Sequence, residues 1–212
     1  MPIIDALHDA PDFGVEPAAH LLYSLALEYP RDTVFLAVVD PGVGGRREAI
    51  VLEADSRRFV GPDNGLFSLL WHRSRQRRCW SIRWRPERLT SSFHGRDLFA
   101  PVAAALATKV AKGWLVAKPA PDVLLDDEDL ASVIYIDHYG NACTGLREHR
   151  NTWRLRVSGR NLPHARTFES ARGPFWYENS MGLVEIAAPK ESAARKLRLE
   201  VGTPVKWQRS TR

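Results

Sequence analysis

The feature that most constrains the fold is a short apolar run that ends in a carboxylate and a glycine turn. Residues 34–39 read Val-Phe-Leu-Ala-Val-Val, and Asp40, Pro41, Gly42 and, five residues later, Arg47 follow them. A Val-rich run of this length is typical of a strand buried on both faces of a parallel sheet. Asp40 would then stand at the carboxyl end of the strand, where open α/β sheets bind their ligands. The run alone leaves two interpretations open, a structural strand-to-helix turn and a functional site.

The first half of the chain alternates between strand-like and helix-like patterns. Strands are expected over residues 2–7, 34–39 and 49–53, and helices over residues 16–28 and 98–112. Apolar residues recur at helical spacing in the first helix, and Pro30 follows its end. Strands that alternate with helices predict an α/β domain with a mainly parallel sheet, built as a sandwich.

The second half changes character after a segment rich in prolines and acids. We expect residues 118–129 to link two domains, which gives an N-terminal α/β domain over 1–117 and a C-terminal domain over 130–212. In the second domain the strands expected are 131–137, 153–157, 182–187 and 204–207, with one short helix over 192–197. Short strands separated by turns predict a small antiparallel, β-barrel-like domain.

Composition and charge exclude several classes of protein. The two cysteines form neither a disulfide framework nor a metal-ligand cluster, so we expect no metal site and a reducing, cytoplasmic setting. No apolar run approaches the length of a membrane span, so we expect no membrane partner. The segment from His72 to Arg88 holds seven arginines and two tryptophans. A nucleic-acid footprint can look like this, but a solvated face with an edge strand is the more common meaning, and we do not expect nucleic-acid binding.

Three polar clusters could carry chemistry. They are Asp40 with Arg47, residues 93–97 (Phe-His-Gly-Arg-Asp) and residues 137–141 (Asp-His-Tyr-Gly-Asn). If the sheet brings them together, a carboxylate, a guanidinium and an imidazole make a site that handles protons. A histidine at a helix N-terminus is more often structural, and spacing alone does not decide between the two meanings for His94.

Five motifs in one order resemble the S-adenosylmethionine (SAM) hydrolase family, also called SAM hydroxide adenosyltransferases, relatives of the fluorinases and chlorinases. The motifs are residues 39–47, 61–66, 93–97, 137–141 and 178–182, and the resemblance spans residues 3–207. It implies a homotrimer with active sites between subunits. It also implies that water or hydroxide attacks C5′ of SAM, giving adenosine and L-methionine, with SAM as substrate and no cofactor.

The resemblance also implies roles for individual residues. Asp40, Arg47 and His94 would be the catalytic set. The residues that would bind substrate are Phe13, Phe93, Gly95, Asp137, Tyr139, Asn141, Ser180, Glu185 and Ala188. Sulfonium chemistry already makes methionine a good leaving group, so the difficulty lies with the nucleophile. Arg47 would lower the pKa of a bound water, and Asp40 and His94 would hold and relay its proton.

Two details of the sequence bear on the alternatives. Asp40 would repel a halide and favour water, and the halogenases carry a Tyr-Pro-x-Thr turn where this chain has Asp40-Pro41-Gly42-Val43, so a 5′-halogenase is disfavoured. Family members usually begin with a strand and a Thr-Asp-Phe-Gly turn that binds the ribose, and we expect this chain to lack both. The alternative to an active hydrolase is therefore a catalytically impaired homologue that binds adenosine or SAM.

Overall fold

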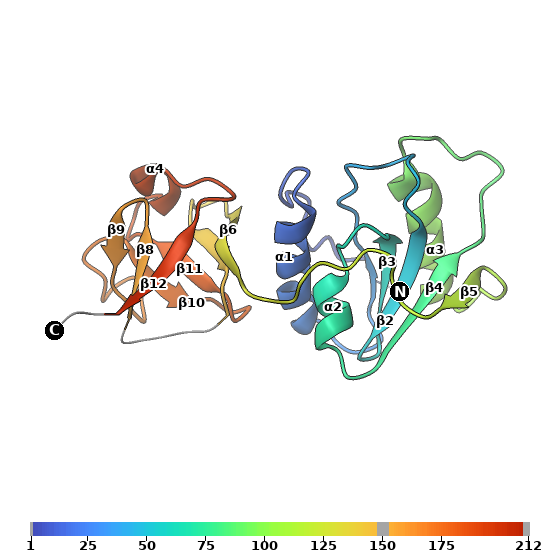
Figure 1. The fold of residues 1–212 in the computed structure, drawn as a ribbon, viewed down its shortest axis with the longest axis horizontal. Coiled ribbons are helices and arrows are strands. Elements are labelled where there is room, and N and C mark those ends of the chain that lie inside the picture. The colour runs from blue at the N-terminus through green and yellow to red at the C-terminus, as the bar shows by residue number, and fades with distance from the viewer. Residues whose placement is uncertain (1, 148–152, 210–212) are drawn as a thin grey trace. The chain divides into compact units, whose positions relative to one another are not determined.

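The computed structural model describes residues 2–147 and 153–209, which divide into two compact units (Figure 1). One unit is Asp12–Asp127, and the other joins Met1–Pro11 to Glu128–Arg212. The first mixes helices and strands and the second is mostly strands, so the predicted two-domain α/β class is confirmed. Among the described residues, none of the helices has the length and hydropathy that crossing a bilayer needs.

The unit Asp12–Asp127 is built on a five-stranded sheet with the order β1-β3-β2-β4-β5. Its strands are β1 (Val34–Leu36), β2 (Ala49–Ala54), β3 (Arg57–Pro62), β4 (Arg77–Ile82) and β5 (Leu115–Lys118). Its helices are α1 (Val15–Leu27), α2 (Ser68–Arg73), the π-helix η1 (Gly95–Phe99) and α3 (Ala100–Ala107). Residues 118–127, predicted as part of a linker, belong to this unit.

Strand pairing in this sheet differs from the mainly parallel arrangement that was predicted. Only β1 and β3 run parallel, while β2 pairs antiparallel with β3 and β4, and β4 with β5. The cause is the turn between β2 and β3, where Asp55 and Ser56 have φ values of 46° and 69°. Two residues with positive φ make the tight turn of a hairpin, which forces antiparallel pairing. The edge strand predicted within residues 72–88 is β4, which lies inside the sheet, and the two edge strands are β1 and β5.

Helices cover both faces of the sheet, and β2 shows how (Figure 1). Ile50 and Leu52 pack in the core that includes residues of α1 and α2. Ala49 and Val51, which point the other way, pack in the core that includes α3. Because both faces are covered, the strand reads as a continuous apolar run rather than an alternating one.

The unit that contains Glu128–Arg212 has two antiparallel sheets, with the orders β10-β11-β7-β6 and β12-β8-β9. The strands are β6 (Leu130–Ile136), β7 (Ala142–Gly145), β8 (Trp153–Val157), β9 (Arg160–Leu162), β10 (Phe175–Glu178), β11 (Val184–Ala187) and β12 (Val205–Arg209), with the helix α4 (Ala193–Leu197). The predicted antiparallel pattern is confirmed, but the described strands form no closed barrel. Both sheets and α4 contribute to one core, in which Trp176, Leu155 and Leu197 are buried.

Candidate active site

Asp40 and Arg47 are joined in the segment that follows β1, which ends at Leu36 and is shorter than the predicted strand over residues 34–39. Arg47 Nε lies 3.1 Å from each carboxylate oxygen of Asp40, and Arg47 Nη2 also donates to Oδ2. The two side chains are only 11% and 4% exposed. The turn between them is tight, because Gly44 has a φ of +77° and a Cβ there would lie 2.6 Å from the carbonyl oxygen of Ser91. The glycine therefore lets the turn pass close to the loop that precedes His94.

His94 completes the cluster from a distant part of the same unit. Its Nδ1 lies 2.9 Å from Arg47 Nη2. Burial and the neighbouring Arg47 charge lower the pKa of His94 below the usual value, and Asp40 only partly opposes this. The imidazole is therefore neutral at neutral pH, with Arg47 between it and the carboxylate.

The π-helix η1 begins directly after His94 and places Phe99 beneath the cluster. The guanidinium carbon of Arg47 lies 5.2 Å from the centroid of the Phe99 ring, and the His94 ring meets the same ring edge-on at 6.5 Å. Phe99 is fully buried. Sequence reasoning predicted an α-helix from Leu98 and missed Phe99, because no residue pattern marks a π-turn.

Asp97 accepts hydrogen bonds that hold the loop preceding His94 in place. The backbone N–H of Thr90 donates to Asp97 Oδ2 at 3.1 Å, and Arg96 Nε donates to Oδ1 at 2.6 Å. The hydrogen bonds from Arg96 and Thr90 hold the pKa of Asp97 well below its usual range. Phe93 is 54% exposed, and the guanidinium carbon of Arg96 lies 4.8 Å from the centroid of its ring.

A pocket in the other unit gathers most of the residues predicted to bind substrate. Its volume is about 730 Å³, within the range of small-molecule sites. Among its lining residues are the predicted Asp137, Tyr139, Asn141, Glu185 and Ala188, together with Phe168 and Tyr177, which the sequence reasoning missed. Aromatic rings beside a few polar groups are suited to a flat heterocycle with hydrogen-bonding edges.

The wall formed by residues 137–141 is a turn that one carboxylate stabilises. Asp137 accepts from the Asn141 backbone N–H at 2.8 Å and from Asn141 Nδ2 at 2.9 Å. Gly140 has a φ of +86°, and a Cβ there would clash with Ser192 at the start of α4. Tyr139 is left 72% exposed at the pocket, where a ligand could cover it.

Glu185 lines the pocket but has both carboxylate oxygens occupied by protein donors. Tyr177 Oη donates to Oε1, and Asn179 Nδ2 donates to Oε2 at 2.8 Å. Asn179 Oδ1 in turn accepts from the backbone N–H groups of Met181 and Leu183. Ser180 lies in this turn and not among the pocket's lining residues. Glu185 thus supports the turn that carries Ser180.

The remaining predicted residues lie in the unit Asp12–Asp127. Phe13 precedes α1 with a φ of 56° and an 81% exposed side chain. Gly95 starts η1, and a Cβ there would only make ordinary contact with Val38. Cys79 and Cys143 are free and buried, and burial raises the pKa of each thiol to about 12. Neither is a thiolate nucleophile at neutral pH.

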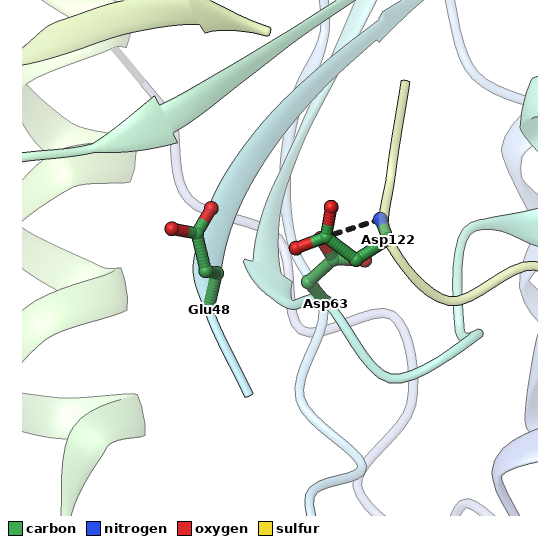
Figure 2. A group of neighbouring side chains, drawn as sticks. All are labelled: Glu48, Asp63 and Asp122. Atoms are coloured by element: carbon green, nitrogen blue, oxygen red, sulfur yellow. Dashed lines mark hydrogen bonds between the residues drawn. The ribbon is translucent and has the colours of Figure 1, made fainter. Parts of the chain in front are cut away.

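Figure 2 shows a second polar cluster, in which the carboxylates of Glu48, Asp63 and Asp122 converge. Their oxygens lie within 4.8 Å of one another, a spacing that could hold a cation. Lys118 Nζ lies 3.2, 3.0 and 2.9 Å from these three carboxylates. Burial lowers the pKa of Lys118, but the three acidic partners outweigh it and hold that pKa above its usual value. The ammonium group supplies the positive charge, so this cluster is structural.

Comparison with protein families gives matches along nearly the whole chain. A sequence model of the SAM hydroxide adenosyltransferase N-terminal domain matches residues 1–113, and one of the corresponding C-terminal domain matches residues 131–206.

Two similar proteins are each named (R)-S-adenosyl-L-methionine hydrolase. One, from Thermus thermophilus, is 35% identical over 96% of this chain and 87% of its own. The other, from Salinispora arenicola, is 37% identical over 94% of this chain and 84% of its own. Both therefore resemble this chain across both of its units.

Two solved structures have a similar fold. An uncharacterized conserved protein from Thermotoga maritima superposes with a TM-score of 0.86 at 29% identity, covering 99% of this chain and 89% of its own. A conserved hypothetical protein from Thermus thermophilus has a TM-score of 0.77 at 34% identity, covering 97% and 86%.

Proposed function

Because the chain belongs to the SAM hydroxide adenosyltransferase family, we propose that it hydrolyses S-adenosyl-L-methionine to adenosine and L-methionine. The names of the relatives favour the (R) configuration at the sulfonium sulfur. The observation that carries the proposal is the cluster of Asp40, Arg47 and His94, which hydrogen bonds join and in which Asp40 and Arg47 are largely shielded from solvent.

The reaction is a displacement at C5′ of the ribose. Oxygen from water or hydroxide forms a bond to C5′, the bond from C5′ to sulfur breaks, and sulfur keeps the electron pair as neutral methionine. Because the sulfonium leaves without an acid, the protein must provide an activated nucleophile and hold it in line with the breaking bond. The Arg47 cation beside the nucleophile lowers the pKa of a bound water, and Asp40 fixes the orientation of that cation. Chemistry of this kind calls for no cofactor or metal.

The pocket of the other unit supplies the binding surface in this proposal. Tyr139, Phe168 and Tyr177 offer rings on which the adenine base can stack, and Asp137 and Asn141 offer polar groups for the nucleoside. The other predicted binding residues are Phe13, Phe93, Gly95, Ser180, Glu185 and Ala188. Glu185 would act mainly by supporting the turn that carries Ser180, because its oxygens already accept protein hydrogen bonds.

Assembly and setting complete the proposal. We propose a homotrimer with active sites between subunits, which rests on the family resemblance. We also propose a reducing, cytoplasmic setting, which is supported by two cysteines that are both free thiols.

The test is incubation of the chain with each sulfonium epimer of SAM, followed by chromatography for adenosine and methionine. We expect equal amounts of the two products, with faster turnover of the (R) epimer, and a loss of at least about 100-fold in kcat for Asp40→Asn. Calorimetric binding of adenosine without any turnover would instead identify a binding protein and overturn the proposal.

A further inference from the structure

The contact between Arg47 and His94 fixes where the imidazole carries its proton. A guanidinium has only N–H donors and no acceptor, and it stays charged at any pH a protein tolerates. In the 2.9 Å contact between Arg47 Nη2 and His94 Nδ1, the imidazole nitrogen must therefore be the acceptor. Nδ1 is then unprotonated, and the single ring proton of neutral His94 lies on Nε2.

The neighbouring groups leave Arg47 little freedom to release this contact. Nη2 carries two hydrogens, and these serve Asp40 Oδ2 and His94 Nδ1. Nε is bound to the same carboxylate, which holds the guanidinium plane on one side. The buried ring of Phe99 lies beneath the guanidinium and edge-on to His94. A change of tautomer would therefore break a hydrogen bond inside a packed cluster.

A protonated imidazole does not fit here either. Both ring nitrogens would then be donors, so Nδ1–H would face an N–H of Arg47. The charged groups that act on His94 are Arg47, Asp40, Arg85 and Asp97. Burial and the cation of Arg47 lower the pKa of His94, in agreement with the geometry.

We propose that Arg47 locks His94 in the Nε2–H tautomer, so that His94 donates a hydrogen bond to the nucleophile and does not remove its proton. This rests on the proposed function, and it replaces the proton relay expected from the sequence. The nucleophile is then hydroxide, formed when the bound water gives its proton to solvent under the influence of Arg47. Hydroxide oxygen bonds to C5′, the C5′–S bond breaks, sulfur keeps the pair, and His94 has the same proton before and after.

The first test reads the tautomer directly and needs no turnover. Long-range ¹H–¹⁵N spectra of the histidine-labelled full chain distinguish a protonated from an unprotonated ring nitrogen, and a His94→Gln sample identifies the His94 signals among the seven histidines. We expect His94 to show a protonated Nε2 and an unprotonated Nδ1 at neutral pH. A protonated Nδ1, or signals averaged between the two tautomers, would overturn the proposal even if the chain hydrolyses SAM.

The second test uses two amide variants to decide whether His94 acts as a hydrogen-bond donor or as a base. His94→Gln places an N–H donor near the position of Nε2, whereas His94→Asn reaches only the position of Nδ1 and lacks the outer donor. Neither amide can act as a base. If His94 donates, His94→Gln should turn over SAM about tenfold or more faster than His94→Asn and His94→Ala. Equal rates for all three variants would overturn the proposal, with thermal unfolding checking that each variant is folded.

Absence of SAM hydrolysis in the unmodified chain is a different outcome. It would refute the proposed function, and the spectra would still decide whether the tautomer is locked.

Discussion

Arg47 makes Asp40 and His94 one cluster, although His94 lies 47 residues further along the chain. It does so through geometry as well as charge, because Nε and Nη2 of its planar guanidinium bind the Asp40 carboxylate and Nη2 also contacts the His94 imidazole. A lysine would keep the charge at one flexible point and could not hold both partners in fixed directions. The arrangement therefore depends on the shape of the arginine.

Replacing Arg47 by lysine should separate charge from geometry. We expect Arg47→Lys to lower kcat by about 10- to 100-fold, because about one hydrogen bond to a charged group is lost and such a bond is worth about 1.5–3 kcal/mol. Adenosine affinity, measured by calorimetry, should change little. Arg58→Lys is the matched control, since Arg58 forms a partly exposed ion pair with Glu53, outside the cluster, and should retain the original rate. A kcat for Arg47→Lys within twofold of the unmodified chain would contradict this role.

The sequence predicted the polar residues of the cluster but not the residues that support them. Asp40 and Arg47 were predicted because a strand end and a glycine turn place them together, and family motifs added His94. Phe99 and Asn179 were not predicted as site residues, because the role of Phe99 depends on a π-turn and that of Asn179 on a side-chain hydrogen bond to Glu185. Contacts of this kind leave no periodic pattern in a sequence.

At the level of elements, the β2–β3 hairpin shows why the predicted sheet was too parallel. A hairpin is usually recognised by Asn-Gly or Asp-Gly between two apolar runs, but this turn is Asp55-Ser56. Both residues adopt positive φ without a glycine, at a cost that the surrounding sheet offsets. Burial on both faces was predicted for residues 34–39, but β1 ends at Leu36 and lies at the edge of the sheet, with Leu36 48% exposed. The strand that is buried on both faces is β2. Strand direction depends on the turn.

The same turn supplies a stability prediction. Ser56→Gly removes the Cβ penalty at a φ of 69° and should raise the free energy of unfolding by about 0.5–1 kcal/mol. Urea unfolding followed by tryptophan fluorescence measures the change. Ser56→Ala is the control, since alanine also has a Cβ and should bring no gain. Destabilisation by the glycine would mean that the serine side chain contributes more than its backbone strain costs.

At the scale of the whole molecule, the proposed catalytic and binding residues belong to different units. Asp40, Arg47 and His94 lie in Asp12–Asp127, whereas the pocket lies in the unit that contains Glu128–Arg212. This second unit also includes the first residues of the chain, and Tyr135 Oη donates to Asp9 at 2.8 Å there. Local sequence patterns do not reveal a contact between residues 126 positions apart. For this reason the first residues of the chain were predicted to belong to the N-terminal domain.

Because the proposed catalytic and binding residues belong to different units, the proposed trimer can be tested with two variants. If each active site combines the cluster of one subunit with the pocket of its neighbour, Asp40→Asn and Asn141→Ala damage different halves of it. Each variant alone should be nearly inactive. Co-expressed in equal amounts, they should form mixed trimers in which about a quarter of the sites pair an intact cluster with an intact pocket, so roughly a quarter of the original activity returns. Chromatography with light scattering checks that the mixed species are trimers. If the activity of the mixture equals the average of the two separate variants, each active site combines the cluster and the pocket of the same subunit.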